Sequence, residues 1–208
     1  MRIIKENSYD IVRLYINQIG ITIFSVFLYS AIALIGDNDT LFKALEITVS
    51  VFAFLFYVFL VYTVVWEIGA KDKIRVDSGK YERTPAKGFL MGLVANLPNL
   101  LFGVLSLIFF AIYAIWGNGG VANVAGVIFL ITKFHAAMFL GFVQGVTPSP
   151  TEEETMMVKA DSLIESGLYI ILPMLSVLIT HLAYYLGTKD FKIFNFKRKS
   201  ADDQSKKS

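Results

Sequence analysis

Long apolar runs separated by short polar segments dominate the pattern along this chain. A helix needs about 20 uncharged, mostly apolar residues to cross roughly 30 Å of hydrocarbon. Five such windows occur, namely Ile16–Ile35, Ile47–Trp66, Gly88–Trp116, Val121–Val146 and Gly167–Leu186. Backbone N–H and C=O groups find no water in hydrocarbon, so these windows must be helical. The pattern therefore predicts an all-α fold, a polytopic integral membrane helix bundle with five hydrophobic segments.

The third and fourth windows depart from a simple spanning helix. Gly88–Trp116 is too long for one straight crossing and is interrupted by Asn96-Leu97-Pro98-Asn99. A proline removes a backbone hydrogen bond and frees carbonyl groups upstream. The break is therefore either a binding element, as in the discontinuous helices of transporters, or the end of an interfacial elbow over Gly88–Leu97 that leads into a helix over Pro98–Trp116. The fourth window carries Lys133 and His135 near its middle.

The composition agrees with a membrane protein. Of the 208 residues, 55% are hydrophobic and 17% are charged, whereas soluble domains average roughly 25% charged residues. We expect a single transmembrane helical domain over residues 1–199 and a disordered polar tail over residues 200–208. The chain has no cysteine, which excludes disulfides and thiol catalysis. Its net charge of +2 provides no basic field for nucleic acid.

The distribution of basic residues conflicts with the number of windows. Lysine and arginine concentrate at the N-terminus, in residues 69–87 and after residue 188. The positive-inside rule makes all three regions cytoplasmic, whereas five crossings would separate the two termini. Either the third or the fourth window is re-entrant, or five spans remain and the basic C-terminus is external. We predict a cell-membrane protein whose N-terminus and residues 69–87 are cytoplasmic.

Polar residues inside the apolar windows are the candidates for a ligand site. A cation at the centre of a spanning helix costs on the order of 3 kcal/mol, so Lys133 should face a partner or a cavity, unless it snorkels to the surface. On an ideal helix Gln144 lies within about 20° of Lys133, whereas His135 lies roughly 160° away. The histidines either relay protons or bond a neighbouring helix, and without a nearby carboxylate they predict no metal site. The candidate ligand-binding residues are Lys133, His135, Asn96, Asn99, His181 and Gln144.

Small residues and a basic segment suggest two kinds of contact surface. Glycine and alanine at a spacing of four let helices approach closely, and we expect such packing at Gly88, Gly92, Ala137, Gly141 and Gly145. Phe139, on another flank of the fourth window, is expected to face lipid. Aromatic residues alternate with basic ones in the C-terminal segment, as on an anionic lipid surface. The basic residues are Lys192, Lys197, Arg198 and Lys199.

The motifs of common enzymes are missing from the sequence. It contains no P-loop, H-E-x-x-H or G-x-S-x-G pattern, so we predict no catalytic residues and no cofactor. The leading hypothesis is a small multi-pass membrane protein that serves as a transport component or accessory membrane subunit with a mid-membrane polar site. The alternative is a membrane scaffold or envelope-assembly factor whose basic cytoplasmic segments bind partners or anionic lipid. The expected partners are the lipid bilayer and other membrane subunits or a second copy of this chain.

Overall fold

The computed structural model describes residues 2–34, 39–82, 84–147, 160–191 and 193, and every regular element among them is helical. The elements are α1 (Arg2–Glu6), α2 (Ser8–Ile32), α3 (Asp39–Asp77), α4 (Lys87–Ala95), α5 (Leu97–Trp116), α6 (Gly119–His135), the 3₁₀ turn η1 (Ala137–Phe139), α7 (Leu140–Val146) and α8 (Ala160–Thr188). Four of them, α2, α3, α5 and α8, are long and apolar enough to cross a membrane. The prediction of an all-α chain with several membrane-length helices is confirmed.

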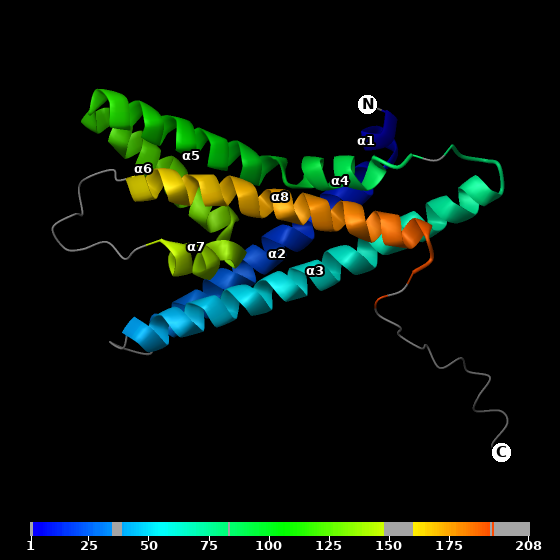
Figure 1. Ribbon diagram of the computed structural model, residues 1–208, viewed down its shortest axis with the longest axis horizontal. Coiled ribbons are helices and arrows are strands. Elements are labelled where there is room, and N and C mark those ends of the chain that lie inside the picture. The colour runs from blue at the N-terminus through cyan, green and yellow to red at the C-terminus, as the bar shows by residue number, and fades with distance from the viewer. Residues whose placement is uncertain (1, 35–38, 83, 148–159, 192, 194–208) are drawn as a thin grey trace, which may run out of the picture.

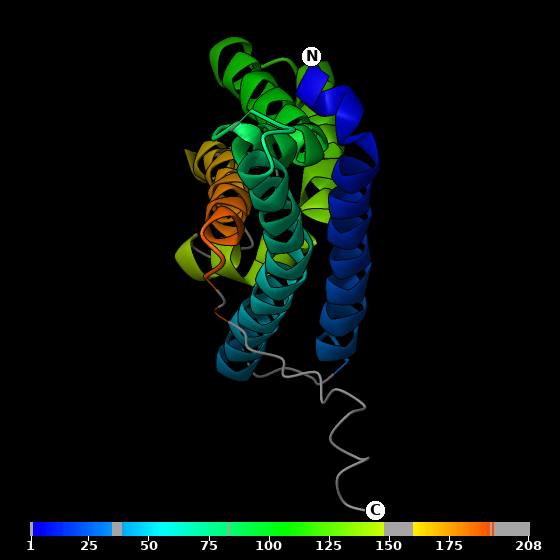
Figure 2. The same cartoon turned by 90° about the vertical axis from the view of Figure 1, so that its right-hand side faces the viewer.

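The long helices run along one axis and give the molecule two ends (Figure 1). α1, the C-terminus of α3, the start of α4 and the C-terminus of α8 gather at one end, which we call the basic end; Figure 2 looks onto it. The C-terminus of α2, the start of α3, the turn between α5 and α6 and the start of α8 lie at the other, the distal end. The helix ends next to the three basic regions of the sequence thus meet at one end.

Helices α4 and α5 pack together along α8 in one antiparallel line. The contacts pair Gly88 with Tyr184, Gly92 with Thr180 and Gly103 with Tyr169. Their register is the same on both sides of Asn96, where α4 ends and α5 begins. The stretch before the break is therefore a buried helix that extends α5 toward the basic end. Close packing against α8 holds α4 inside the bundle, and α4 is a helix separate from α5, as the break in the sequence predicts.

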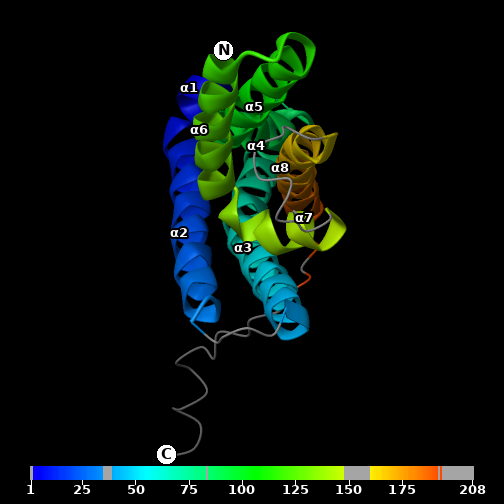
Figure 3. The same cartoon turned by 90° about the vertical axis from the view of Figure 1, so that its left-hand side faces the viewer.

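The fourth window forms a bent pair, with α6 and α7 at 81° to each other. α6 enters from the distal end and stops in the middle of the bundle, where the Thr22 hydroxyl donates to the His135 carbonyl at 2.9 Å. α7 then runs across the bundle (Figure 3), and Gly145 reaches Ile47 near the start of α3. The pair begins and ends toward the distal end, so these contacts favour the re-entrant arrangement over five full crossings.

Two helices extend beyond their apolar windows. α3 continues past Trp66 to Asp77, so Lys71, Lys73 and Arg75 lie on a helix and not in a loop. α8 begins at Ala160, well before the window that hydropathy assigns to it. Charged residues end an apolar window because they do not enter hydrocarbon, but they do not end a helix.

The core lies where α2, α3, α4, η1 and α8 meet. Phe139 is part of it, with an exposed fraction of 0% and its ring centroid 5.8 Å from that of Phe54. The expectation that Phe139 faces lipid is wrong. The bend after α6 turns the η1 segment inward, so the face expected for a straight helix no longer applies.

Candidate functional site

A row of polar residues follows the buried side of α8 through the bundle. We call it the polar seam. On α8 it begins with the adjacent pair Glu165 and Ser166 and continues every three to seven residues with Tyr169, Ser176, Thr180 and Tyr184. Ser166, Tyr169 and Ser176 are fully buried. The Ser166 hydroxyl lies 3.0 Å from that of Ser106 on α5. Some of these groups serve helix packing, but a polar row that ends at ionisable residues inside a bundle typically marks a functional path, so the seam is the candidate functional site.

An ion pair lies at the distal part of the seam. The Lys133 Nζ is 3.1 Å from Glu165 Oε2, and the two side chains are 32% and 17% exposed. The same ammonium lies 4.4 Å from the ring centroid of Phe129. Lys133 also occupies the last turn of α6, where the helix dipole favours a positive charge. Lys133 thus has the partner that a buried cation requires.

Sequence reasoning missed Glu165 because it assigned residues 147–166 to a loop. The signal was present in the spacing of Ser166, Tyr169 and Ser176, which continues a helical polar face upstream of Gly167. A helix beginning before Glu165 would have placed its carboxylate on that face.

The middle of the seam is formed around the break between α4 and α5. The Gln18 amide donates to Asn96 Oδ1 at 3.2 Å, and the Asn96 amide donates to the Gly92 carbonyl at 3.0 Å. The Tyr57 hydroxyl faces both Asn96 and Ser176. Asn96 therefore bonds a carbonyl near the end of α4 and links α2, α3, α4 and α8. Gln18 had not been predicted, although a glutamine in the first apolar window was visible.

Several buried polar atoms near the seam have no hydrogen-bond partner among the described residues. They are Gln18 Oε1, Asn99 Nδ2, the Tyr169 hydroxyl, Ser176 Oγ and His181 Nδ1. Each such group costs about 1–3 kcal/mol if it stays unbonded. Native proteins usually pair such groups with protein atoms or ordered water, so these are positions where water or a polar solute can bond.

A second ion pair closes the seam at the basic end. The Lys87 Nζ lies 2.6 Å from Asp72 Oδ2, and the two side chains are 3% and 4% exposed. The Tyr184 hydroxyl donates to the same oxygen at 2.9 Å, and the Arg75 guanidinium lies 3.8 Å from Asp72 Oδ1. These contacts join α3, α4 and α8, and Gly88 permits the close approach because a Cβ there would overlap Tyr184.

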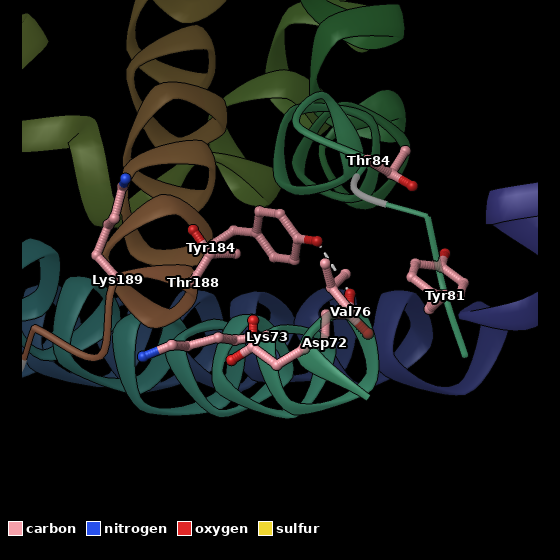
Figure 4. Close-up of a pocket in the computed structure, with 9 residues that line it drawn as sticks. Asp72, Lys73, Val76, Tyr81, Thr84, Tyr184, Thr188 and Lys189 are labelled. Carbon is pink, nitrogen blue, oxygen red and sulfur yellow. Dashed lines mark hydrogen bonds between the residues drawn. The ribbon is translucent and has the colours of Figure 1, made fainter. Parts of the chain in front are cut away.

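A pocket opens beside this cluster, as Figure 4 shows. Its volume is about 260 Å³, and Asp72 and Tyr184 form part of its wall. The other lining residues include Lys73, Val76, Tyr81, Thr84 and Lys189. The pocket thus combines a buried, paired carboxylate and the exposed Asp77 with one lysine on α3 and one just after α8.

The two histidines do not share a site. His135 Nδ1 lies 3.1 Å from the Ile131 carbonyl of its own helix, and its ring centroid is 5.0 Å from that of Phe102. His181 lies on α8 toward the basic end, with its ring edge-on to Phe89 at 6.4 Å between centroids. Within the described residues, no three His, Asp or Glu side chains group to hold a metal ion.

Gln144 lies apart from Lys133 because the chain bends between them. With its amide nitrogen turned toward the carboxylate, Gln144 donates to both oxygens of Glu46, at 2.7 and 2.8 Å. It therefore binds α7 to the start of α3. The ideal-helix row that placed Gln144 beside Lys133 is wrong, since an 81° bend separates the two helices.

The small residues chosen from the sequence lie at helix contacts. A Cβ on Gly141 would overlap the Glu46 carbonyl, and one on Gly145 would touch Ile47. Ala137 is buried in η1, while Gly88 and Gly92 meet α8. The basic residues Lys192, Lys197, Arg198 and Lys199 lie outside the described residues.

Comparisons with models of protein families, with curated proteins and with solved structures find no match to this chain. The site itself therefore carries the functional reasoning.

Proposed function

We propose that this chain is a small multi-pass membrane protein that acts as a transport component, with the polar seam as a path for small polar or charged solutes. The observation that carries the proposal is the seam itself, a buried polar row that links the Lys133–Glu165 pair to the Asp72–Lys87 pair. Ionisable residues within membrane spans typically face the bundle interior or a watery cavity and mark solute pathways.

The outer surface supports a position within the bilayer. Large apolar side chains are exposed on several helices, including Phe27 at 71%, Leu55 at 61% and Leu130 at 69%. Exposed apolar patches of this extent suit lipid and not water. The basic end is then cytoplasmic, as the positive-inside rule requires, and the α6–α7 pair is a re-entrant hairpin that enters from the distal side.

The unpartnered polar atoms supply a chemical reason for solute movement. A solute that leaves water needs groups that replace its hydration, and selectivity arises from such groups along a path. Gln18 Oε1 and Asn99 Nδ2 are of this kind near the break between α4 and α5. Helix α6 also stops in the middle of the bundle. In known transporter folds, the ends of half-helices at membrane depth coordinate ions.

Cysteine accessibility tests the proposal directly, since the chain has no native cysteine. Ser176→Cys places a thiol in the seam, whereas Leu178→Cys places one on the lipid side of α8, where Leu178 is 54% exposed. In proteoliposomes we expect a small charged methanethiosulfonate reagent to modify the cysteine at position 176 and to spare the one at position 178.

The opposite result separates the two hypotheses drawn from the sequence. If Ser176→Cys stays unreactive from both sides while Ser78→Cys reacts, water does not enter the seam and the transport proposal fails. The alternative hypothesis, a scaffold that binds partners through its basic segments, predicts that water does not enter the seam.

A further inference from the structure

The pocket beside Asp72 has a charge pattern suited to one class of ligand. We propose that it binds a phosphate-bearing anion, either the headgroup of an anionic phospholipid or a soluble phosphate compound. This inference does not depend on solute movement through the polar seam. It uses the residues that line the pocket, chiefly Lys73, Tyr81 and Lys189.

Two lysines supply the positive charge. Lys73 comes from α3 and Lys189 follows the end of α8. Their ammonium groups lie toward the same side of the view in Figure 4 and point in different directions, that of Lys189 lying 5.8 Å from the ring centroid of Tyr185. Neither forms an ion pair within 4.0 Å of a carboxylate among the described residues. Lysine binds phosphate as a mobile point charge, so these two flexible side chains can turn toward one anion.

The acidic residues of the wall do not cancel this charge. The Asp72 carboxylate is already bound by Lys87 at 2.6 Å, by Tyr184 at 2.9 Å and more distantly by Arg75. Asp77 is exposed to solvent, where water and salt weaken its repulsion of an anion. The lining carries two lysines and two aspartates. With the neighbouring Arg75, Lys87 and Asp190, the basic groups outnumber the acidic ones by one.

The size of the pocket favours a small polar group. Sites for drug-sized ligands and cofactors usually measure about 300–1,000 Å³, whereas this pocket measures about 260 Å³. The Tyr81 and Thr84 side chains lie on the side away from the two ammonium groups (Figure 4). A headgroup-sized anion fits this space, with its phosphate at the lysines.

The pocket also lies where lipid headgroups are expected. Trp66 stands near it on α3, and its indole N–H donates to the Phe191 carbonyl at 2.7 Å, just beyond α8. Tryptophan side chains concentrate at the headgroup level of membranes. The backbone N–H of Ile193 donates to the Tyr62 hydroxyl at 2.9 Å, which fixes the chain after Lys189 beside α3.

Ligand titration of the purified full chain in a neutral detergent tests the proposal. The probes are short-chain phosphatidylglycerol, the matching diacylglycerol without phosphate, glycerol phosphate and inorganic phosphate, with binding measured by calorimetry. We expect phosphatidylglycerol or one of the soluble phosphates to bind and the diacylglycerol not to bind. Binding of phosphatidylglycerol alone identifies a lipid headgroup as the source, whereas equal binding of glycerol phosphate identifies a soluble compound.

Matched variants tie the binding to the pocket. Lys73→Gln with Lys189→Gln should weaken binding at least tenfold, whereas Lys5→Gln with Lys71→Gln removes the same charge elsewhere and should change it less than twofold. All four lysines are at least partly exposed, so without ligand both double variants should melt at the temperature of the parent protein. If the variant with both Lys73→Gln and Lys189→Gln melts lower, Lys189→Gln alone replaces it in the binding measurement. If no phosphate probe binds, or if both double variants weaken binding equally, the pocket is not a phosphate site.

Discussion

Replacing the buried Lys87 by methionine should destabilise the protein more than the same replacement of an exposed lysine. The change leaves the Asp72 carboxylate, 4% exposed, without the ammonium that lies 2.6 Å away. Removing one member of a buried pair costs about 3–5 kcal/mol. Tyr184 and Arg75 still contact Asp72, so we expect a value near the lower limit, about 3 kcal/mol.

Thermal unfolding in a neutral detergent, followed by circular dichroism, measures this loss. For a chain of this size 1 kcal/mol corresponds to about 2–4 °C in Tm, so Lys87→Met should lower the Tm by about 6–12 °C. Lys71→Met is the matched control. Its ammonium lies 2.8 Å from Glu67, but both side chains are more than half exposed, and such pairs contribute at most about 1 kcal/mol.

A second substitution distinguishes a lost partner from lost packing. Asp72→Asn combined with Lys87→Met removes both charges, so no uncompensated ion remains buried. The double variant should recover more than half of the loss in Tm caused by Lys87→Met alone. If Lys87→Met melts like Lys71→Met, or if the two losses simply add, Asp72 and Lys87 do not stabilise the bundle as a buried pair.

Three further predictions concern the α6–α7 hairpin. Gly141→Leu should lower the Tm by several degrees, because overpacking costs roughly 1–3 kcal/mol and a Cβ there overlaps the Glu46 carbonyl. Gly126→Leu is the control and should leave the Tm unchanged, since a Cβ there meets nothing within 4 Å. Equal melting of the two variants would contradict this packing. Lys133→Met should destabilise the protein because it leaves Glu165 unpaired, and adding Glu165→Gln should restore part of the lost Tm. If the double variant is no more stable than Lys133→Met, the broken ion pair does not cause the loss of stability. An impermeant thiol reagent should label cysteines at Asn118 and Ser149 from one side of the membrane and cysteines at Ser78 and Ser205 from the other. Five full crossings would instead separate positions 118 and 149, so finding these two on opposite sides would exclude the re-entrant arrangement.

The positions of the helices were predictable from hydropathy because hydrocarbon permits only hydrogen-bonded backbone. The break at Asn96 was also predictable, because Pro98 has no backbone N–H to donate to a hydrogen bond within a helix. The requirement that Lys133 have a partner also followed from the sequence. Which residue provides it did not, because Glu165 is distant in sequence and meets Lys133 only when α8 packs beside α6.

The Asp72–Lys87 pair was hidden for a different reason. Both residues lie in a charged stretch that hydropathy assigns to a solvated loop. Their burial depends on α3 continuing past Trp66 and on α4 turning back against it. Contact between residues 15 positions apart on two helices is decided by tertiary packing, and glycines such as Gly187, which meets the Trp66 backbone, allow that packing.

The bend between α6 and α7 carries no proline, and its backbone groups are bonded from other helices. The Thr22 hydroxyl donates to the His135 carbonyl, and the Gly141 N–H donates to Ser50 Oγ at 2.8 Å and to the Tyr29 hydroxyl at 3.1 Å. Irregular backbone at membrane depth requires such partners. The polar residues of the first two windows therefore bond the bend in the fourth. In the proposed re-entrant arrangement this segment adds no net crossing, and hydropathy and basic charge then agree.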